Sequence, residues 1–301
     1  MSLNKPVWKL KNWINEKKLF NDALSLNLNA IDYLKKNPHK IDWKFLSANP
    51  NAIELLEMNL DKINWKFLSL NSNAIKILEE NQDKIHWKNL CENLNGIKIL
   101  RKNQDKIHWH IICQYTNDIQ FLRDNFNKIN WIYLSYNENA IELLEENKDL
   151  INYSALSKNP NAIKLLMENK KAICWYNFCE NPNAIKIIEE EIKQNPNNIK
   201  WSILSENPNA IKILEKNPNK INWYNLSYNP KGIDLFNKFQ DFTYVFYYGF
   251  SRNPDIFELD YKTMQKNNED MEEALIKELL KPSRVFKERD YDYLEILFND
   301  E

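Results

Sequence analysis

Apolar and polar positions alternate along this chain in a pattern that recurs every twenty-two residues and contains two helical stretches. In one unit, Trp43–Leu46 carries apolar residues at helical spacing, and Ala52–Leu56 carries a second apolar stripe. Asp42 precedes the first stretch and Asn49 the second, and both residue types cap helix starts. Each unit is therefore predicted to hold two short helices: an A helix that starts beside the tryptophan, and a B helix that starts at Asn49-Pro50 and its equivalents.

One aromatic residue per unit sets the register of the repeat. Tyr153 replaces tryptophan once, and four extra residues near Glu190 to Gln194 lengthen one interval. Because this slot is constant and lies beside apolar residues, we interpret it as a buried structural ladder between A helices and not as a stacking platform for bases. The ladder consists of Trp43, Trp65, Trp87, Trp109, Trp131, Tyr153, Trp175, Trp201 and Trp223.

The repeat predicts the fold class. The first unit has Asn21 in the tryptophan slot and the last has Tyr247, which gives about eleven units of 22 residues. Helices this short need neighbours to supply a core, so we predict an all-α fold, an α-solenoid of two-helix repeats. Helices packed at roughly 8–10 Å would make a rod or superhelix on the order of 100 Å long.

The ends of the chain are predicted to cap the array. Residues 1–20 form the expected N-terminal cap, 21–258 the repeat array, and 259–301 a C-terminal capping segment with a helix at Met271–Leu280 ended by Pro282.

Composition excludes several function classes. Lysine and arginine number 41 against 42 aspartate and glutamate residues, so the net charge of −1 does not favour nucleic acid or anionic lipid. The three glycines form no phosphate-binding pattern, which argues against nucleotide hydrolysis. No apolar run approaches the ~20 residues that span a bilayer, and no secretory signal is evident, so a cytoplasmic location is expected.

Three strings resemble the short helical repeats found in many copies in giant DNA viruses of protists, mimivirus-like and related: Lys62-Ile63-Asn64-Trp65, Leu143-Leu144-Glu145-Glu146-Asn147 and Leu204-Ser205-Glu206-Asn207-Pro208-Asn209-Ala210-Ile211. The resemblance covers nearly the whole chain and includes Asn253-Pro254-Asp255-Ile256-Phe257 near its end. It implies a virus-encoded helical repeat protein, located in the host cytoplasm or the virion. That family has no settled activity, so the resemblance implies a source and a fold more than a function.

Histidines and cysteines gather in two adjacent units and form a weak candidate for a metal site. The residues are His86, Cys91, His108 and Cys113, with His110 nearby. Zinc needs four ligands at roughly 2.0–2.3 Å from one centre, whereas equivalent atoms of stacked units lie about one helix spacing apart. We therefore expect no metal, no cofactor and no catalytic residue, because the histidines lack a distinctive nucleophile or carboxylate partner.

The predicted function is that of a noncatalytic protein-protein interaction scaffold. Stacked units present an extended surface that varies from unit to unit, and a protein or peptide is the expected partner. Regularly spaced asparagines such as Asn49 and Asn59 are expected to cap helices and close turns, although a row of them could also hold a peptide in a concave groove. The sequence does not decide which face is concave. The candidate contacts flank the tryptophans: Lys44, Lys66, Lys88, His110, Ile132 and Tyr176.

Two alternatives stay open. A structural virion component would self-associate, for which the aromatic residues Phe242, Tyr244, Tyr248 and Phe250 of the last unit are candidates. A single-stranded RNA-binding array would need a basic groove, which makes nucleic acid an unlikely partner for a chain of this charge. The oligomeric state is not indicated by the sequence.

Overall fold

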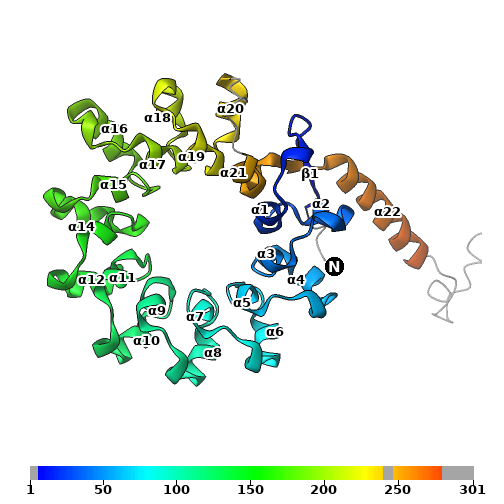
Figure 1. Ribbon diagram of the computed structural model, residues 1–301, viewed down its shortest axis with the longest axis horizontal. Helices are drawn as coiled ribbons and strands as arrows, with labels where there is room; N and C mark the ends of the chain where they lie inside the picture. The colour runs from blue at the N-terminus through cyan, green and yellow to red at the C-terminus, as the bar shows by residue number, and fades with distance from the viewer. Residues whose placement is uncertain (1–5, 240–246, 280–301) are drawn as a thin grey trace, which may run out of the picture. The chain divides into compact units, whose positions relative to one another are not determined.

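The computed structural model describes residues 6–239 and 247–279. Contacts divide the chain into a larger unit, Leu10–Phe257, and a smaller unit that combines Met1–Lys9 with Glu258–Glu301. The two units are described separately. The larger unit contains the repeats and forms a ring (Figure 1).

The A helices of the larger unit begin at the predicted slot. A capping side chain precedes many of them; Asn64, for example, accepts the backbone N–H of Phe67 at 3.2 Å. Across the described residues the A helices are α1 (Asn21–Leu26), α3 (Trp43–Leu46), α5 (Trp65–Leu68), α7 (Trp87–Leu90), α9 (Trp109–Tyr115), α11 (Trp131–Tyr136), α13 (Tyr153–Leu156), α15 (Trp175–Phe178), α17 (Trp201–Glu206), α19 (Trp223–Tyr228) and α21 (Tyr247–Arg252). These eleven starts confirm the predicted α-solenoid of two-helix repeats.

The B helices begin slightly later than predicted. Asn49 caps a 3-10 turn at Pro50–Ala52, and the α-helix begins only at Ile53. The cause is local: the Asn49 side chain accepts the N–H of Asn51 at 3.0 Å, which tightens the first turn. The B helices are α2 (Ile31–Lys36), α4 (Ile53–Glu57), α6 (Ile75–Glu80), α8 (Ile97–Lys102), α10 (Ile119–Asp124), α12 (Ile141–Glu146), α14 (Ile163–Glu168), α16 (Ile185–Gln194), α18 (Ile211–Lys216) and α20 (Ile233–Phe239).

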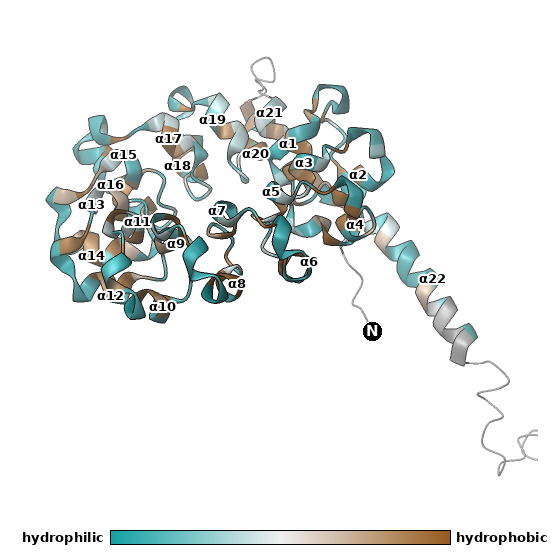
Figure 2. Cartoon of the chain, turned by 60° about the horizontal axis from the view of Figure 1, so that its bottom comes forward, coloured by the Kyte–Doolittle hydropathy of each residue, from teal (hydrophilic) through white to brown (hydrophobic). Residues whose placement is uncertain are grey.

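The A helices line the inside of the ring and the B helices the outside (Figure 1). The core lies between these two rows, where Leu46 of α3 and Ala52 and Leu56 of the next segment are fully buried. Hydrophilic residues mark the turns around the outside (Figure 2). Burial of one leucine side chain contributes about 1.5–3 kcal/mol, so the repeated leucines supply most of the stability that no single unit has alone.

Most junctions between neighbouring units repeat the same side-chain hydrogen bonds; the junction between the units of α7 and α9 differs, because Tyr115 takes the place of the asparagine. The buried Asn71 side chain donates from Nδ2 to the carbonyl oxygens of Ser47 (3.0 Å) and Asn49 (2.9 Å) of the preceding unit. The N–H of Asn64 donates to Ser47 Oγ at 2.9 Å, and Asn73 Nδ2 donates to the Pro50 carbonyl at 2.9 Å. These bonds set the relative position of adjacent units.

The first and last units make the same junction with each other. Asn27 Nδ2 donates to the carbonyl oxygens of Ser251 (3.0 Å) and Asn253 (2.8 Å), and the N–H of Phe20 donates to Ser251 Oγ at 2.8 Å. Asn29 Nδ2 completes the set by donating to the Pro254 carbonyl at 3.2 Å. Helix α1 accordingly packs against α21.

The expectation of an extended rod or superhelix is therefore wrong, because the first and last units join. The small rotations between neighbouring units add up along the array, so it returns to its own start. Aromatic contacts reinforce this closure: Trp13 meets Phe250 with ring centroids 6.2 Å apart, and Phe20 meets Tyr248 at 5.6 Å. The assignment of 1–20 and 259–301 as caps stays a prediction.

Most residues of a short strand pairing belong to the smaller unit. Strands β1 (Trp8–Leu10) and β2 (Phe257–Leu259) form a two-stranded sheet, and the N–H of Asp260 donates to the Val7 carbonyl at 2.8 Å. Helix α22 (Tyr261–Leu279) begins ten residues before the predicted Met271, because Asp260 caps it at Thr263 (3.2 Å). Pro282 lies outside the described residues. None of the described helices combines the length and apolar character needed to cross a membrane.

Candidate functional site

Two positions on each A helix or in the turn that follows it define the candidate binding surface. The first row is the residue after the tryptophan slot, and the second row is the residue four positions further on, on the same helical face. The first row comprises Asp22, Lys44, Lys66, Lys88, His110, Ile132, Ser154, Tyr176, Ser202, Tyr224 and Tyr248. The second row comprises Leu26, Ala48, Leu70, Glu92, Gln114, Tyr136, Lys158, Glu180, Glu206, Tyr228 and Arg252.

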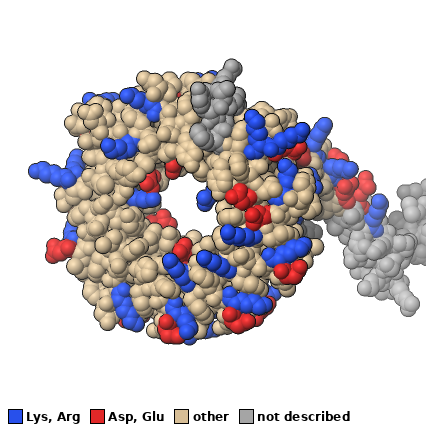
Figure 3. Space-filling model, in the orientation of Figure 1, with Lys and Arg blue, Asp and Glu red and all other residues tan. Residues whose placement is uncertain are grey.

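The six candidate contacts predicted from sequence all fall in the first row. Lys44, Lys66, Lys88 and His110 are exposed, Ile132 is 53% exposed and Tyr176 52% exposed. Their helices, α3, α5, α7, α9, α11 and α15, lie along the inside of the ring (Figure 1). Basic side chains gather on the inner margin over α3, α5 and α7 (Figure 3). The sequence analysis did not identify the second row, although it lies one helical turn after the first row and could have been found from that spacing.

The basic part of the first row lacks carboxylate partners. Lys44 Nζ lies 5.0 Å and 5.3 Å from the ring centroids of Phe45 and Phe67, and neither Lys44, Lys66 nor Lys88 forms an ion pair with a described residue. In the second row, Lys158 and Glu180 pair with each other. The three lysine charges therefore remain available to a ligand.

On the outer face, by contrast, many basic side chains have carboxylate partners. A series of ion pairs joins neighbouring B helices and their adjoining turns, and these pairs add modestly to stability at such exposed positions. The pairs are Lys35–Glu54, Glu79–Lys98, Arg101–Asp118, Arg123–Glu146, Glu145–Lys164, Lys148–Glu168 and Glu215–Lys238.

The aromatic ladder is less buried than expected. All nine residues, from Trp43 to Trp223, are half-buried. One indole face packs on its B helix, as where Trp109 stacks on Phe121 with centroids 5.5 Å apart. A lysine nineteen residues later covers several rings: Lys62 lies 4.7 Å from the Trp43 centroid. Because a B helix packs on one face of the indole and a lysine covers several of these indoles, the tryptophans are not suited to stacking on bases.

The asparagines equivalent to Asn49 hold neighbouring units together, and their side chains have no hydrogen-bonding capacity left for a ligand. Asn159 is 1% exposed; its Nδ2 donates to two carbonyls of the preceding unit, and its Oδ1 accepts the Asn161 N–H. Asn59, by contrast, acts locally by donating to the Leu55 carbonyl at 2.9 Å. We expected both kinds of asparagine to act within their own unit. This holds for Asn59, but Asn159 and its equivalents also link neighbouring units through the side-chain amide.

The weak metal candidates take part in junctions and caps. Cys91 Sγ accepts the His108 N–H and Cys113 Sγ accepts the Asn130 N–H, each at 3.4 Å, as serines do elsewhere. His86 Nδ1 accepts the Asn89 N–H at 3.3 Å and so caps α7. Burial raises the pKa of the Cys91 and Cys113 thiols, which disfavours the thiolate that binds metal. Across the described residues, no three His, Cys, Asp or Glu side chains are placed to share a metal ion.

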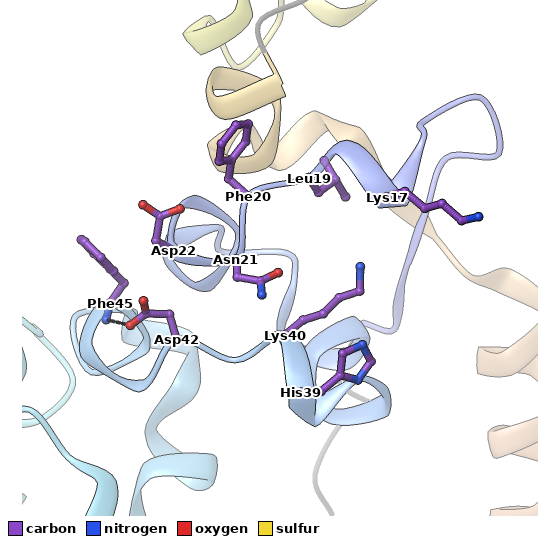
Figure 4. A pocket seen from close by; sticks show the side chains of 9 residues that line it. All are labelled: Lys17, Leu19, Phe20, Asn21, Asp22, His39, Lys40, Asp42 and Phe45. Carbon is purple, nitrogen blue, oxygen red and sulfur yellow. Dashed lines mark hydrogen bonds between the residues drawn. The ribbon is translucent and has the colours of Figure 1, made fainter.

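A shallow pocket lies beside the closure, between α1 and α3. Phe20, Asn21, Asp22, Asp42 and Phe45 form one part of its lining. In Figure 4 the side chains of Phe20 and Phe45 point away from each other, and the polar groups do not converge on one point. We therefore assign no chemistry to this pocket.

A second pocket lies across α17, α19 and α21. Its volume is about 570 Å³, and its lining consists of Glu206, Tyr224, Tyr228, Pro230, Arg252 and Pro254. The Tyr224 and Tyr228 hydroxyls are 3.2 Å apart. Burial and this hydrogen bond raise the pKa of Tyr228 to about 12, so the phenol stays neutral.

No protein-family model, no curated protein and no solved structure matches the chain. Inferences about its function therefore rest on its own residues and geometry.

Proposed function

We propose that the protein is a noncatalytic scaffold that binds an extended segment of a partner protein along the inside of the ring. The observation that carries this proposal is the contrast between the two faces. The outer face joins its units by ion pairs, whereas Lys44, Lys66 and Lys88 on the inside lack such partners. The inner rows also vary from unit to unit, which suits recognition of one particular sequence.

The chemistry of the inner rows favours a protein segment over RNA. The basic stretch is limited to α3–α7, and Ile132 and Tyr176 follow it in the first row. Glu92, Glu180 and Glu206 stand in the second row, where they would repel a continuous phosphate backbone. A protein segment can match such changes of charge along its length.

Noncatalytic behaviour and a monomeric ring are parts of the same proposal. Burial raises the pKa of the Cys179 thiol as well as those of Cys91 and Cys113, which makes all three poor nucleophiles. Self-association through the ends has less support, because the terminal units pack on each other. Phe250, a candidate for self-association, is 1% exposed, while Phe242 and Tyr244 lie outside the described residues. The role in an infected cell or a virion rests only on the resemblance to giant-virus repeats.

Peptide-display selection on the intact protein tests the proposal. Peptides selected on the wild-type protein are measured against the triple variant Lys44→Glu, Lys66→Glu, Lys88→Glu. We expect a loss of affinity of about tenfold or more, because three unpaired charges are reversed. The same variant is titrated with single-stranded RNA at several salt concentrations.

The matched control reverses three exposed lysines of the outer helices, Lys76, Lys186 and Lys212, and so changes the net charge equally. Peptide binding should survive in this control. Binding on the inside of the ring would be contradicted if both triple variants lost the same amount of peptide affinity. It would also be contradicted if the selection enriched no peptide beyond the level found with an unrelated helical protein. If the wild-type protein and the outer control bind RNA in a salt-dependent manner and the inner variant does not, the partner is RNA and not a protein segment.

A further inference from the structure

The pocket across α17, α19 and α21 has a lining that suits one class of ligand. Tyr224 and Tyr228 lie one helical turn apart on α19, with ring centroids 5.4 Å apart in an edge-to-face arrangement. Pro230 and Pro254 contribute two further rings to the lining. Grooves lined by aromatic rings recognise polyproline II segments, whose extended shape is already formed before binding.

Opposite charges flank the two tyrosines along the ring. Glu206 stands on α17 on one side, and Arg252 stands on α21 on the other. Both are exposed, and neither forms an ion pair with another described residue. The carboxylate of Glu206 lies near both Glu180 and Lys158, which pair with each other, so Glu206 is the negative charge on this side of the pocket that has no ion-pair partner among the described residues. A ligand that crosses the pocket along the ring therefore meets a negative charge, two tyrosines and a positive charge in that order.

The spacing of the units matches the repeat of a polyproline II helix. Helices α17, α19 and α21 pack against one another in sequence, and packed helices generally lie roughly 8–10 Å apart. A polyproline II helix has three residues per turn and rises about 3.1 Å per residue, so its turn measures about 9 Å. Such a segment would present one residue of the same face to each of the three consecutive units.

We propose that this pocket binds a polyproline-type segment in which a proline faces Tyr224 and Tyr228, a basic residue faces Glu206 and an acidic residue faces Arg252. The charged residues stand three positions before and three positions after the central proline. This inference rests on the proposed function and specifies the partner for one sector of the ring. Polyproline II segments are pseudo-symmetric, so the proposal includes either chain direction.

Fluorescence anisotropy on the full chain tests the charge pattern. The probe is the labelled peptide Pro-Arg-Pro-Pro-Pro-Pro-Pro-Glu-Pro, with a version in the reverse order. Comparison peptides replace both charges by glutamine, replace arginine by glutamate, or move glutamate two positions closer to arginine. We expect the mixed-charge peptide in at least one order to bind about tenfold more tightly than all three.

A charge reversal at one end of the pocket provides the decisive variant. Glu206→Lys places positive charges at both ends, so it should lose the mixed-charge peptide and prefer the peptide with two glutamates by about tenfold. Glu80→Lys, an exposed change on the outer helix α6, serves as the control and should keep the wild-type order of affinities. Both replaced side chains are exposed, so the ring should fold in each variant.

The outcomes separate this inference from the proposed function. Equal affinity for charged and neutral peptides, or an unchanged preference in Glu206→Lys, overturns the polyproline assignment. If display selection still yields peptides whose binding depends on Lys44, Lys66 and Lys88, the scaffold function stands without it. If the variant reverses the preference, the ligand class of this sector is established.

Discussion

Replacing Asn27 by alanine tests the ring closure at a single side chain. Asn27 belongs to the first repeat unit described, and in an open array residues 1–20 would offer no repeat unit to accept its amide. In the closed ring its side chain is fully buried, and Nδ2 donates to the carbonyls of Ser251 and Asn253 at 3.0 Å and 2.8 Å. Its Oδ1 also accepts the Asn29 N–H at 3.0 Å.

The expected magnitude follows from these three bonds. A buried hydrogen bond contributes about 1 kcal/mol net, so Asn27→Ala should lower the free energy of unfolding by about 3 kcal/mol. An open array would keep only the bond to Asn29, and the loss would be about 1 kcal/mol. Asn159→Ala is the matched control, because Asn159 makes the same three bonds at an interior junction. The account predicts similar losses at the two sites.

Urea unfolding followed by tryptophan fluorescence and by circular dichroism measures both losses. Coincident transitions are needed, because repeat arrays can unfold in more than one step. A loss of about 3 kcal/mol for Asn159→Ala together with 1 kcal/mol or less for Asn27→Ala would refute the closed ring.

Two further predictions concern cysteines. Cys174 precedes α15 without capping it, so Cys174→Asn should add the missing cap and stabilise the protein by about 1 kcal/mol, seen as a higher midpoint of thermal unfolding; an unchanged or lower midpoint would contradict this. Burial raises the pKa of Cys113 above its ordinary value of 9.0, so the unfolded chain releases this proton first as pH rises. The stabilisation from the protonated thiol is complete below pH 9 and declines as the pH rises above it. Cys113→Ser should therefore reduce the fall in unfolding free energy between pH 8 and 10. An identical fall in the wild-type protein and the variant would contradict this prediction.

The repeat units were predictable because their determinants are local. A capping residue, a tryptophan and a leucine within four positions specify an A helix, as Asn64, Trp65 and Leu68 show. The closure was not predicted, because a small rotation at each junction depends on packing and not on residue type. One signal was available: Asn27 keeps the junction asparagine, although residues 1–20 do not contain a repeat unit.

The candidate surface was only half predicted. The first row was found from its variability beside the tryptophans, but the inside of the ring was not, since it depends on the closure. Glu206 and Arg252 lie 46 positions apart in sequence and flank one pocket only because consecutive units stack. The burial of Trp43 was overestimated: part of the cover on its ring is the side chain of Lys62, from a turn nineteen residues later, and the indole stays half-buried.

Chemical cross-linking across the closure tests the central claim most directly. Phe20→Cys and Tyr248→Cys replace two side chains whose rings are 5.6 Å apart, in a Cys174→Asn background that removes the one native thiol that is not buried. A short bismaleimide should join residues 20 and 248 within one chain, at a rate independent of protein concentration. Tyr176→Cys replaces Tyr248→Cys in the control, which should not cross-link. An absence of the 20–248 product, or a yield that rises with protein concentration, would contradict a ring closed by its own first and last repeats.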